Sequence, residues 1–186
     1  MKTLSILALT FALTLSAFAA PPVSLPEVNS LIDKIGVTPK PQAELEADPA
    51  FIRLSEICTG NSVAVTDALP GVSNGDAGAS LVIRAMQSLP AAEYMTMLEK
   101  LPALVKQRQI GVPVLASAIS PRGRMTAFLP DNYQNPRVVA FVAAARPSFA
   151  GTPSDGMLGA LMAGAVTKAF DAHRAKGESI PKVLLP

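Results

Sequence analysis

The sequence predicts an all-α fold of about five to seven short helices, in an irregular orthogonal array packed on a longer C-terminal helix. Prolines and glycines divide the chain at intervals of helical length, and apolar residues within these intervals recur at helical spacing. Between residues 90 and 153, successive prolines lie 6 to 12 residues apart with no fixed period. Regular solenoids repeat at a constant length, so this spacing favours an irregular array.

The N-terminal residues have the pattern of a secretory signal peptide. Lys2 provides a positive charge, residues 4–18 are largely apolar, and Ala17 and Ala19 place small side chains at the two positions that signal peptidase recognises. About 15 apolar residues are fewer than the roughly 20 that a membrane-spanning helix needs. We therefore expect cleavage after Ala19, export to the periplasm or the exterior, and no transmembrane anchor in the mature protein.

We expect four segments along the chain. They are a signal peptide (1–19), an extended tail with a short helix (20–42), one helical domain (43–178) and a C-terminal tail (179–186). Early prolines favour the extended tail, and Gly36 is expected to end the short helix predicted for residues 27–35. A mature chain of 167 residues is long enough for one domain with a substantial core.

Capping signals define two helices in the first half of the domain. Asp48-Pro49 is typical of an N-cap followed by proline in the first turn, and Gly60 is expected to end that helix. Asp76 is expected to cap a second helix that extends to about Ser88.

Prolines also divide the second half of the domain. Residues 90–100 and 102–110 are predicted as two helices, or as one kinked helix that ends at Gly111. A further helix is expected to begin at Asn135-Pro136.

Residues 114–129 allow a β-hairpin, because Pro121 and Gly123 fit the second and fourth positions of a type I turn. The flanking residues 114–119 and 124–129 are rich in alanine and do not alternate between apolar and polar. We therefore favour two short helices over the hairpin.

The last predicted helix has the strongest start signal. Thr152 is expected at the N-cap, with Pro153 in the first turn and Asp155 three residues after the cap, and Gly177 is expected to end the helix. Large apolar side chains occupy one broad side and glycine and alanine the other, so we expect this helix at the centre of the domain. His173 lies in its last turn, where a capping or partly buried structural role is favoured over catalysis or haem ligation.

Charge is unevenly distributed along the chain. Residues 27–99 carry a net charge of −6 and residues 100–154 a net charge of +6. The two halves either neutralise each other within the fold, or the basic half docks on another envelope protein or an anionic envelope surface. Docking would use a basic surface of four arginines, namely Arg122, Arg124, Arg137 and Arg146. We expect no nucleic-acid partner, because the protein is predicted to be exported.

Few side chains suggest covalent or metal chemistry. Cys58, the single cysteine, shares a helical face with Phe51 and Leu54, which favours burial over pairing with another molecule. One cysteine and one histidine are too few for structural zinc. Met95 and Met97 resemble a Cu(I)-binding pair, but on a helix they point about 200° apart, which favours core packing. We expect no metal and no cofactor.

These observations predict an exported, non-enzymatic protein that acts in binding or as a scaffold. Charged residues make up 16% of the chain, tryptophan is absent, and no spacing of polar residues marks a catalytic site. Two alternatives remain. The six methionines of the mature chain could line a cavity for an apolar small ligand, or carboxylates or serines could form a hydrolase site that only the fold assembles.

Overall fold

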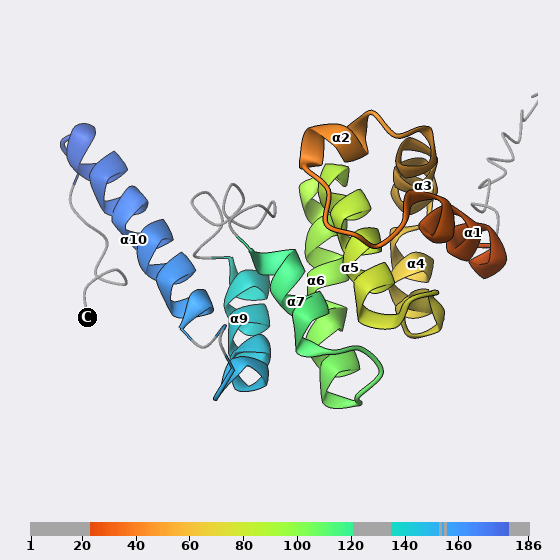
Figure 1. Ribbon diagram of the computed structural model, residues 1–186. Coiled ribbons are helices and arrows are strands. Elements are labelled where there is room, and N and C mark those ends of the chain that lie inside the picture. Colours follow the sequence, from red (N-terminus) through yellow and green to blue (C-terminus); the bar gives the residue numbers. More distant parts are fainter. Residues whose placement is uncertain (1–22, 121–134, 153, 155, 179–186) are drawn as a thin grey trace, which may run out of the picture.

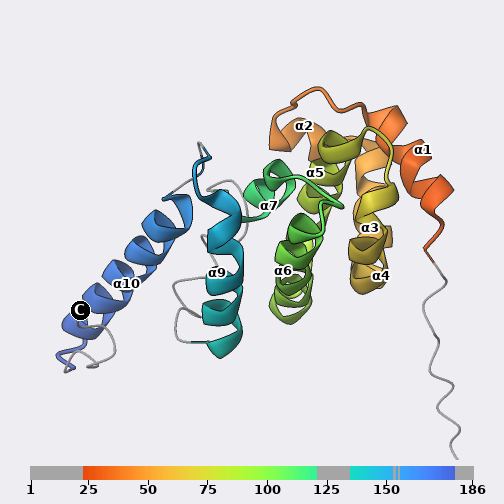
Figure 2. The same cartoon turned by 90° about the horizontal axis from the view of Figure 1, so that it is seen from below.

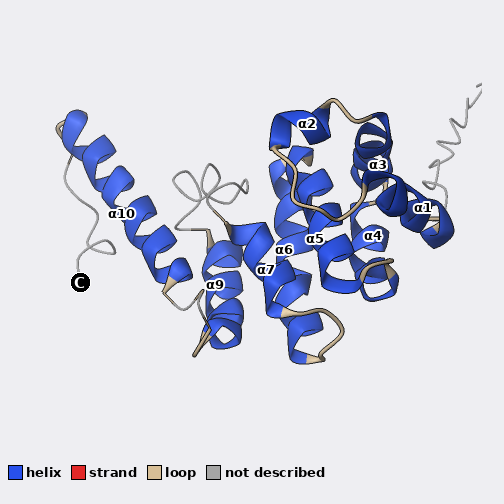
Figure 3. Ribbon diagram, in the orientation of Figure 1, coloured by secondary structure: helices blue, strands red, loops and turns tan. Residues whose placement is uncertain are grey.

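The computed structural model describes residues 23–120, 135–152, 154 and 156–178, and no strand occurs among them (Figure 3). The all-α prediction is therefore confirmed. The helices of these residues, in chain order, are α1 (Leu25–Ile35), α2 (Gln42–Glu46), α3 (Pro49–Gly60), α4 (Ser62–Ala68), η1 (Leu69–Gly71), α5 (Gly75–Ala85), η2 (Met86–Ser88), α6 (Ala91–Lys106), α7 (Val112–Ile119), α9 (Pro136–Phe149) and α10 (Met157–Ala175), where η marks a 3₁₀ helix. They exceed the number expected because short elements such as α2 and α4 begin without a side-chain cap.

Helix α1 lies at one end of the molecule and α10 at the other, and from α5 onward the helices lie progressively nearer the α10 end (Figures 1 and 2). Helix α3 packs against α1 and α5, α5 packs against α7, and α6 packs against α4 and α9. The α3 to α7 region therefore forms the body of the domain, and α2 lies beside α3 at its edge.

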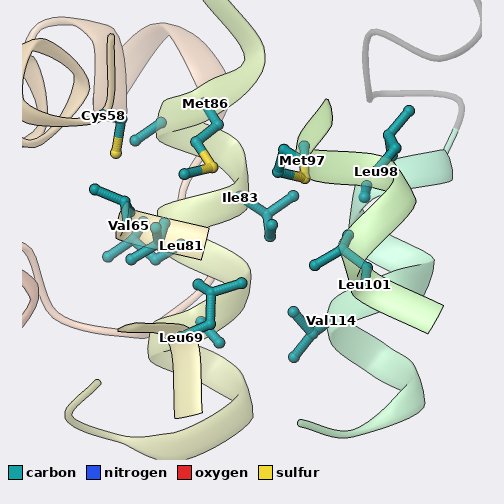
Figure 4. Close-up of a cluster of buried hydrophobic side chains, with 14 of the residues drawn as sticks. Cys58, Val65, Leu69, Leu81, Ile83, Met86, Met97, Leu98, Leu101 and Val114 are labelled. Carbon is teal, nitrogen blue, oxygen red and sulfur yellow. The ribbon is translucent and has the colours of Figure 1, made fainter. Parts of the chain in front are cut away.

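The core lies between α3, α4, α5, α6 and α7 (Figure 4). Ile83 of α5, Leu101 of α6 and Val114 of α7 are fully buried, and Met86 of η2 closes the same cluster. Burying each of these side chains contributes about 1.5–3 kcal/mol. Packing of this kind stabilises helices that are too short to persist alone.

Helix α1 belongs to the same core. Its Val28, Leu31, Ile32 and Ile35 are buried, with the helical spacing that places them on one face. The helix ends as predicted at Gly36, which adopts a φ of +74° and donates its N–H to the carbonyl of Ile32.

Two helix starts predicted from capping signals are confirmed. Asp48 accepts a hydrogen bond from the Ala50 N–H at 2.8 Å at the start of α3. Asn135 accepts one from the Arg137 N–H at 2.9 Å at the start of α9. The end of α3 differs slightly from prediction, since Gly60 is its last helical residue and Asn61 follows as the C-cap.

The predicted N-cap role of Asp76 is wrong. Helix α5 begins at Gly75, and its N-cap, two residues before the predicted one, is Asn74 in the left-handed conformation (φ +61°). Asp76 lies in the first turn, and its Oδ1 accepts a hydrogen bond from the Gly111 N–H at 2.8 Å. A carboxylate that could cap its own helix is instead bound by a backbone group 35 residues away.

The structure also decides two alternatives that the sequence left open. Residues 91–106 form the single helix α6, with Pro102 buried inside it. Residues 112–119 form α7, so a hairpin over 114–129 is excluded; its second half, 124–129, lies outside the described residues.

The start of α10 differs from prediction, whereas its end agrees. Thr152 accepts a hydrogen bond from the Ser154 N–H at 3.2 Å and donates one to the Phe149 carbonyl at 2.7 Å, so it closes a turn after α9. Helix α10 begins only after Gly156. At the other end, Gly177 adopts a φ of +68° in a Schellman motif.

The predicted central position of α10 is wrong. Among its described side chains, Leu158 is buried, Met162 and Phe170 are half-buried, and Gly159 and Gly164 are exposed. The apolar periodicity identified the side of the helix that packs, but it carried no information about how much of the domain covers that side.

Candidate binding groove

A hollow of about 870 Å³ lies beside α3 and is open to solvent. We call it the α3 groove. Its lining comes from four elements, namely Gln42 and Glu46 of α2, Phe51, Ile52, Ser55, Glu56, Thr59 and Gly60 of α3, Arg84 and Ala85 of α5, and Gln87 and Ser88 of η2. The volume is within the range of roughly 300–1,000 Å³ typical of ligand sites.

Helix α3 provides the long side of the groove. Ile52, Ser55, Glu56 and Thr59 recur at helical spacing, so they form one stripe about 10 Å long at 1.5 Å per residue. Ile52 is 45% exposed, whereas its neighbour Phe51 is buried and reaches the groove from the core side. The groove therefore has an apolar surface that is exposed to solvent in the free protein.

The opposite side is fixed by hydrogen bonds among polar side chains. Arg84 donates through Nη2 to Oε1 of Gln42 at 2.9 Å and to the carbonyl of Lys40 at 3.2 Å. Gln42 donates in turn to Glu46 at 2.9 Å across one helical turn. These bonds tie α2 to the end of α5, so the wall is formed before any ligand binds.

A second hollow of about 770 Å³ adjoins the α3 groove and shares Gln42, Arg84 and Gln87 with it. Its remaining lining includes Lys40 from the segment before α2 and Ser117 from α7. The two hollows together form a longer surface depression that extends from α3 past α2 to α7.

Acidic side chains lie at the margin of the α3 groove. Glu46 and Glu56 are both exposed, on α2 and α3 respectively. Arg53 bonds to Glu56 at 3.2 Å and to Glu27 at 3.1 Å, and these hydrogen bonds raise the pKa of Arg53. Because each carboxylate oxygen accepts more than one hydrogen bond, Glu56 retains capacity for a further donor.

Cys58, whose burial is confirmed, is fully enclosed on the core side of α3. Burial raises the pKa of its thiol to about 12. Because the thiolate is the nucleophilic form, this side chain is inert at neutral pH.

Met95 and Met97 are both buried within α6, which confirms the prediction that they pack in the core. The described residues contain no group of three or more His, Cys, Asp or Glu side chains placed to hold a metal ion.

His173 is half-buried at the end of α10, in keeping with the structural role predicted for it. Its Nδ1 lies 2.8 Å from Oε2 of Glu178, which follows the Schellman turn at Gly177. The imidazole therefore joins the last helical turn to the residue beyond it.

The basic surface predicted from four arginines is only partly described, since Arg122 and Arg124 lie outside the described residues. Arg137 at the start of α9 makes a two-pronged ion pair with Glu99 of α6, at 2.6 and 2.7 Å. This pairing lowers the pKa of Glu99 and raises that of Arg137. Arg146 is exposed near the other end of α9.

Among the described residues, two ion pairs join the acidic and basic parts of the chain. Arg137 binds Glu99, and Lys100 binds Asp67 of α4. They support the interpretation that the two halves partly neutralise each other within the fold.

The sequence did not single out the α3 groove. The feature of the sequence that belongs to this groove is the apolar residue Ile52. It lies beside the buried face of α3, which Phe51, Leu54 and Cys58 form, and is not part of that face. A single exposed isoleucine is common on protein surfaces, so it indicates a site only when neighbouring elements form a hollow around it.

Comparison with known protein families, with characterised proteins and with solved structures found no match to this chain. Within the part of the chain that the structure describes, no helix combines the length and the apolar character needed to cross a membrane.

Proposed function

We propose that the protein is an exported, non-enzymatic binding protein of the cell envelope or exterior that holds a segment of a partner protein in the α3 groove. The observation that carries this proposal is the open groove itself, with Ile52 exposed in its lining and polar side chains held by the hydrogen bond of Arg84 to Gln42. Export is inferred from the charged start, apolar stretch and Ala17–Ala19 pattern of the N-terminus.

The openness of the groove favours a macromolecular segment over an apolar small ligand. Carriers of small ligands bury most of the ligand surface, which requires an enclosed cavity. The α3 groove is open and continues into the hollow next to Lys40 and Ser117. A peptide segment suits this shape, because the side of the segment that faces away from the groove is covered by the rest of the partner protein.

Peptide display on the mature protein tests the binding role. A library of random peptides is selected on residues 20–186, and the enriched peptides are then measured by fluorescence anisotropy against the protein and its variants. We expect Ile52→Asp to weaken their binding at least about tenfold, because it places a charge on the apolar wall. Val63→Asp is the control, since Val63 of α4 is similarly exposed, at 48%, and lies outside the groove lining.

Peptides that bind both variants equally, or a library that yields no specific binder, would contradict this role. Circular dichroism and melting curves of both variants confirm that folding is retained. Export is tested separately by N-terminal sequencing of the protein from cell fractions, which should give a mature chain that begins at Ala20. An uncleaved chain in the cytoplasm would contradict it.

A further inference from the structure

The charge around the α3 groove indicates which partner segment it accepts. Resting on the binding role proposed above, we propose that the segment is basic, with Lys or Arg beside an apolar residue. The apolar residue would pack on Ile52 and Phe51, and the basic side chains would pair with Glu46 and Glu56.

The two carboxylates line the same groove as the apolar contact. Glu56 lies on α3 one helical turn after Ile52, and Glu46 lies on the neighbouring helix α2. Both acids are exposed, so a ligand cation reaches them without first being buried. Their existing contacts, from Gln42 to Glu46 and from Arg53 to Glu56, leave carboxylate lone pairs for further donors.

Helix ends add to this negative potential. Thr59 and Gly60 lie in the last turn of α3, and Arg84 and Ala85 in the last turn of α5, and all four line the groove. The C-terminal end of a helix carries a partial negative charge from its unpaired carbonyl groups. The lining also includes one helix start, Gln42 of the short helix α2, so the two C-terminal ends outnumber it and the balance favours a cation over an anion.

The wider charge distribution acts in the same direction. All residues that line the α3 groove lie between positions 42 and 88, within the part of the chain whose net charge is −6. The cation among them, Arg84, has its Nη2 engaged with Gln42 and the Lys40 carbonyl. A basic segment would therefore be attracted toward the groove before contact.

The peptides enriched on the mature protein provide the test. We expect Lys or Arg to be enriched beside an apolar residue, and binding of a synthetic representative to weaken about tenfold between about 50 mM and about 500 mM NaCl. The double variant Glu46→Gln with Glu56→Gln should weaken binding about tenfold, because it removes both charges and keeps the side-chain shape. Glu44→Gln is the control, since Glu44 is an exposed acid of α2 outside the groove lining, and it should change binding less than about twofold.

The outcomes separate the two proposals. Peptides that depend on Ile52 but lack basic residues, and whose binding is insensitive to salt and to the double variant, would overturn the basic segment and leave the binding role standing. Binding independent of Ile52 would overturn the binding role itself. An equal loss with Glu44→Gln and with the double variant would overturn the assignment of Glu46 and Glu56.

Discussion

Oδ1 of Asp76 accepts a hydrogen bond from the backbone N–H of Gly111 at 2.8 Å, which joins the first turn of α5 to the residue before α7. The carboxylate lies directly against the Gly111 Cα, where a β-carbon would overlap Oδ2 of Asp76. The residue at position 111 must therefore lack a side chain for this contact to form.

Gly111→Ala should destabilise the protein by about 1 kcal/mol, because the new methyl group displaces the exposed Asp76 carboxylate and breaks its hydrogen bond. Asp76→Ala should cost about 1 kcal/mol through loss of the hydrogen bond. The double variant distinguishes the mechanism, since removing the carboxylate also removes the overlap. In urea unfolding, the double variant should therefore lose less free energy of unfolding than the two single variants lose in sum. Strict additivity would show that the two residues do not interact.

Cys58 should resist modification in the folded protein. Its side chain is fully buried and burial raises its pKa to about 12, so the native thiol should react with Ellman's reagent at pH 8 only as fast as the structure opens. In denaturant the reaction should be immediate. Rapid modification without loss of helical structure would show that this face of α3 is accessible.

The raised pKa of Cys58 also gives a pH dependence with a definite sign. The folded protein holds the thiol proton more tightly than the unfolded chain, so this contribution to stability is complete below the ordinary pKa of 9.0 and is lost as pH rises toward about 12. Cys58→Ala removes the titrating group. The variant should therefore lose less stability than the wild type between pH 9 and 10.5 in urea titrations, and identical slopes would contradict burial as the cause.

The pairing of Arg137 with Glu99 provides a test of the expectation that the basic part of the chain docks on an anionic surface. Glu99 neutralises Arg137, so Glu99→Gln should strengthen binding of the mature protein to vesicles that contain phosphatidylglycerol. Arg146→Ala should weaken this binding more than Arg137→Ala, because Arg146 is exposed and Arg137 is held by Glu99 and Thr96. Cosedimentation at low and high salt measures both effects, and a loss of binding with Glu99→Gln would contradict the prediction.

Two helix caps formed by contacts within a few residues were predictable from the sequence, whereas contacts between distant elements were not. Asp48 and Asn135 cap the helices that follow them directly, so local signals were sufficient. Asp76 has the same local signal, but Gly111 competes for its carboxylate from 35 residues away. Only the folded chain brings those two groups together.

The candidate groove also could not be predicted from the sequence, because it depends on contacts between distant elements. Glu46, Ile52 and Arg84 come from three helices, and no spacing along the chain connects them. Their individual types are ordinary for exposed or half-buried helix positions. The hollow exists because α2 crosses beside α3 and is held to α5 by Arg84, an arrangement that depends on tertiary packing.

The exposed position of α10 can be tested with substitutions that a helix at the centre of the domain would not tolerate. Among the described residues, no atom outside the chain neighbours and the backbone of α10 lies within 4 Å of the place where a β-carbon would stand at Gly159 or at Gly164. Alanine in the interior of a helix is favoured over glycine by about 0.5–1 kcal/mol, so Gly159→Ala with Gly164→Ala should slow amide hydrogen exchange along α10. Gly78→Ala in α5 is the opposite case, because its β-carbon would overlap the carbonyl oxygen of Ser73, and it should lower the melting temperature. If the two α10 substitutions destabilised the protein instead, another segment would have to lie against one of these two positions.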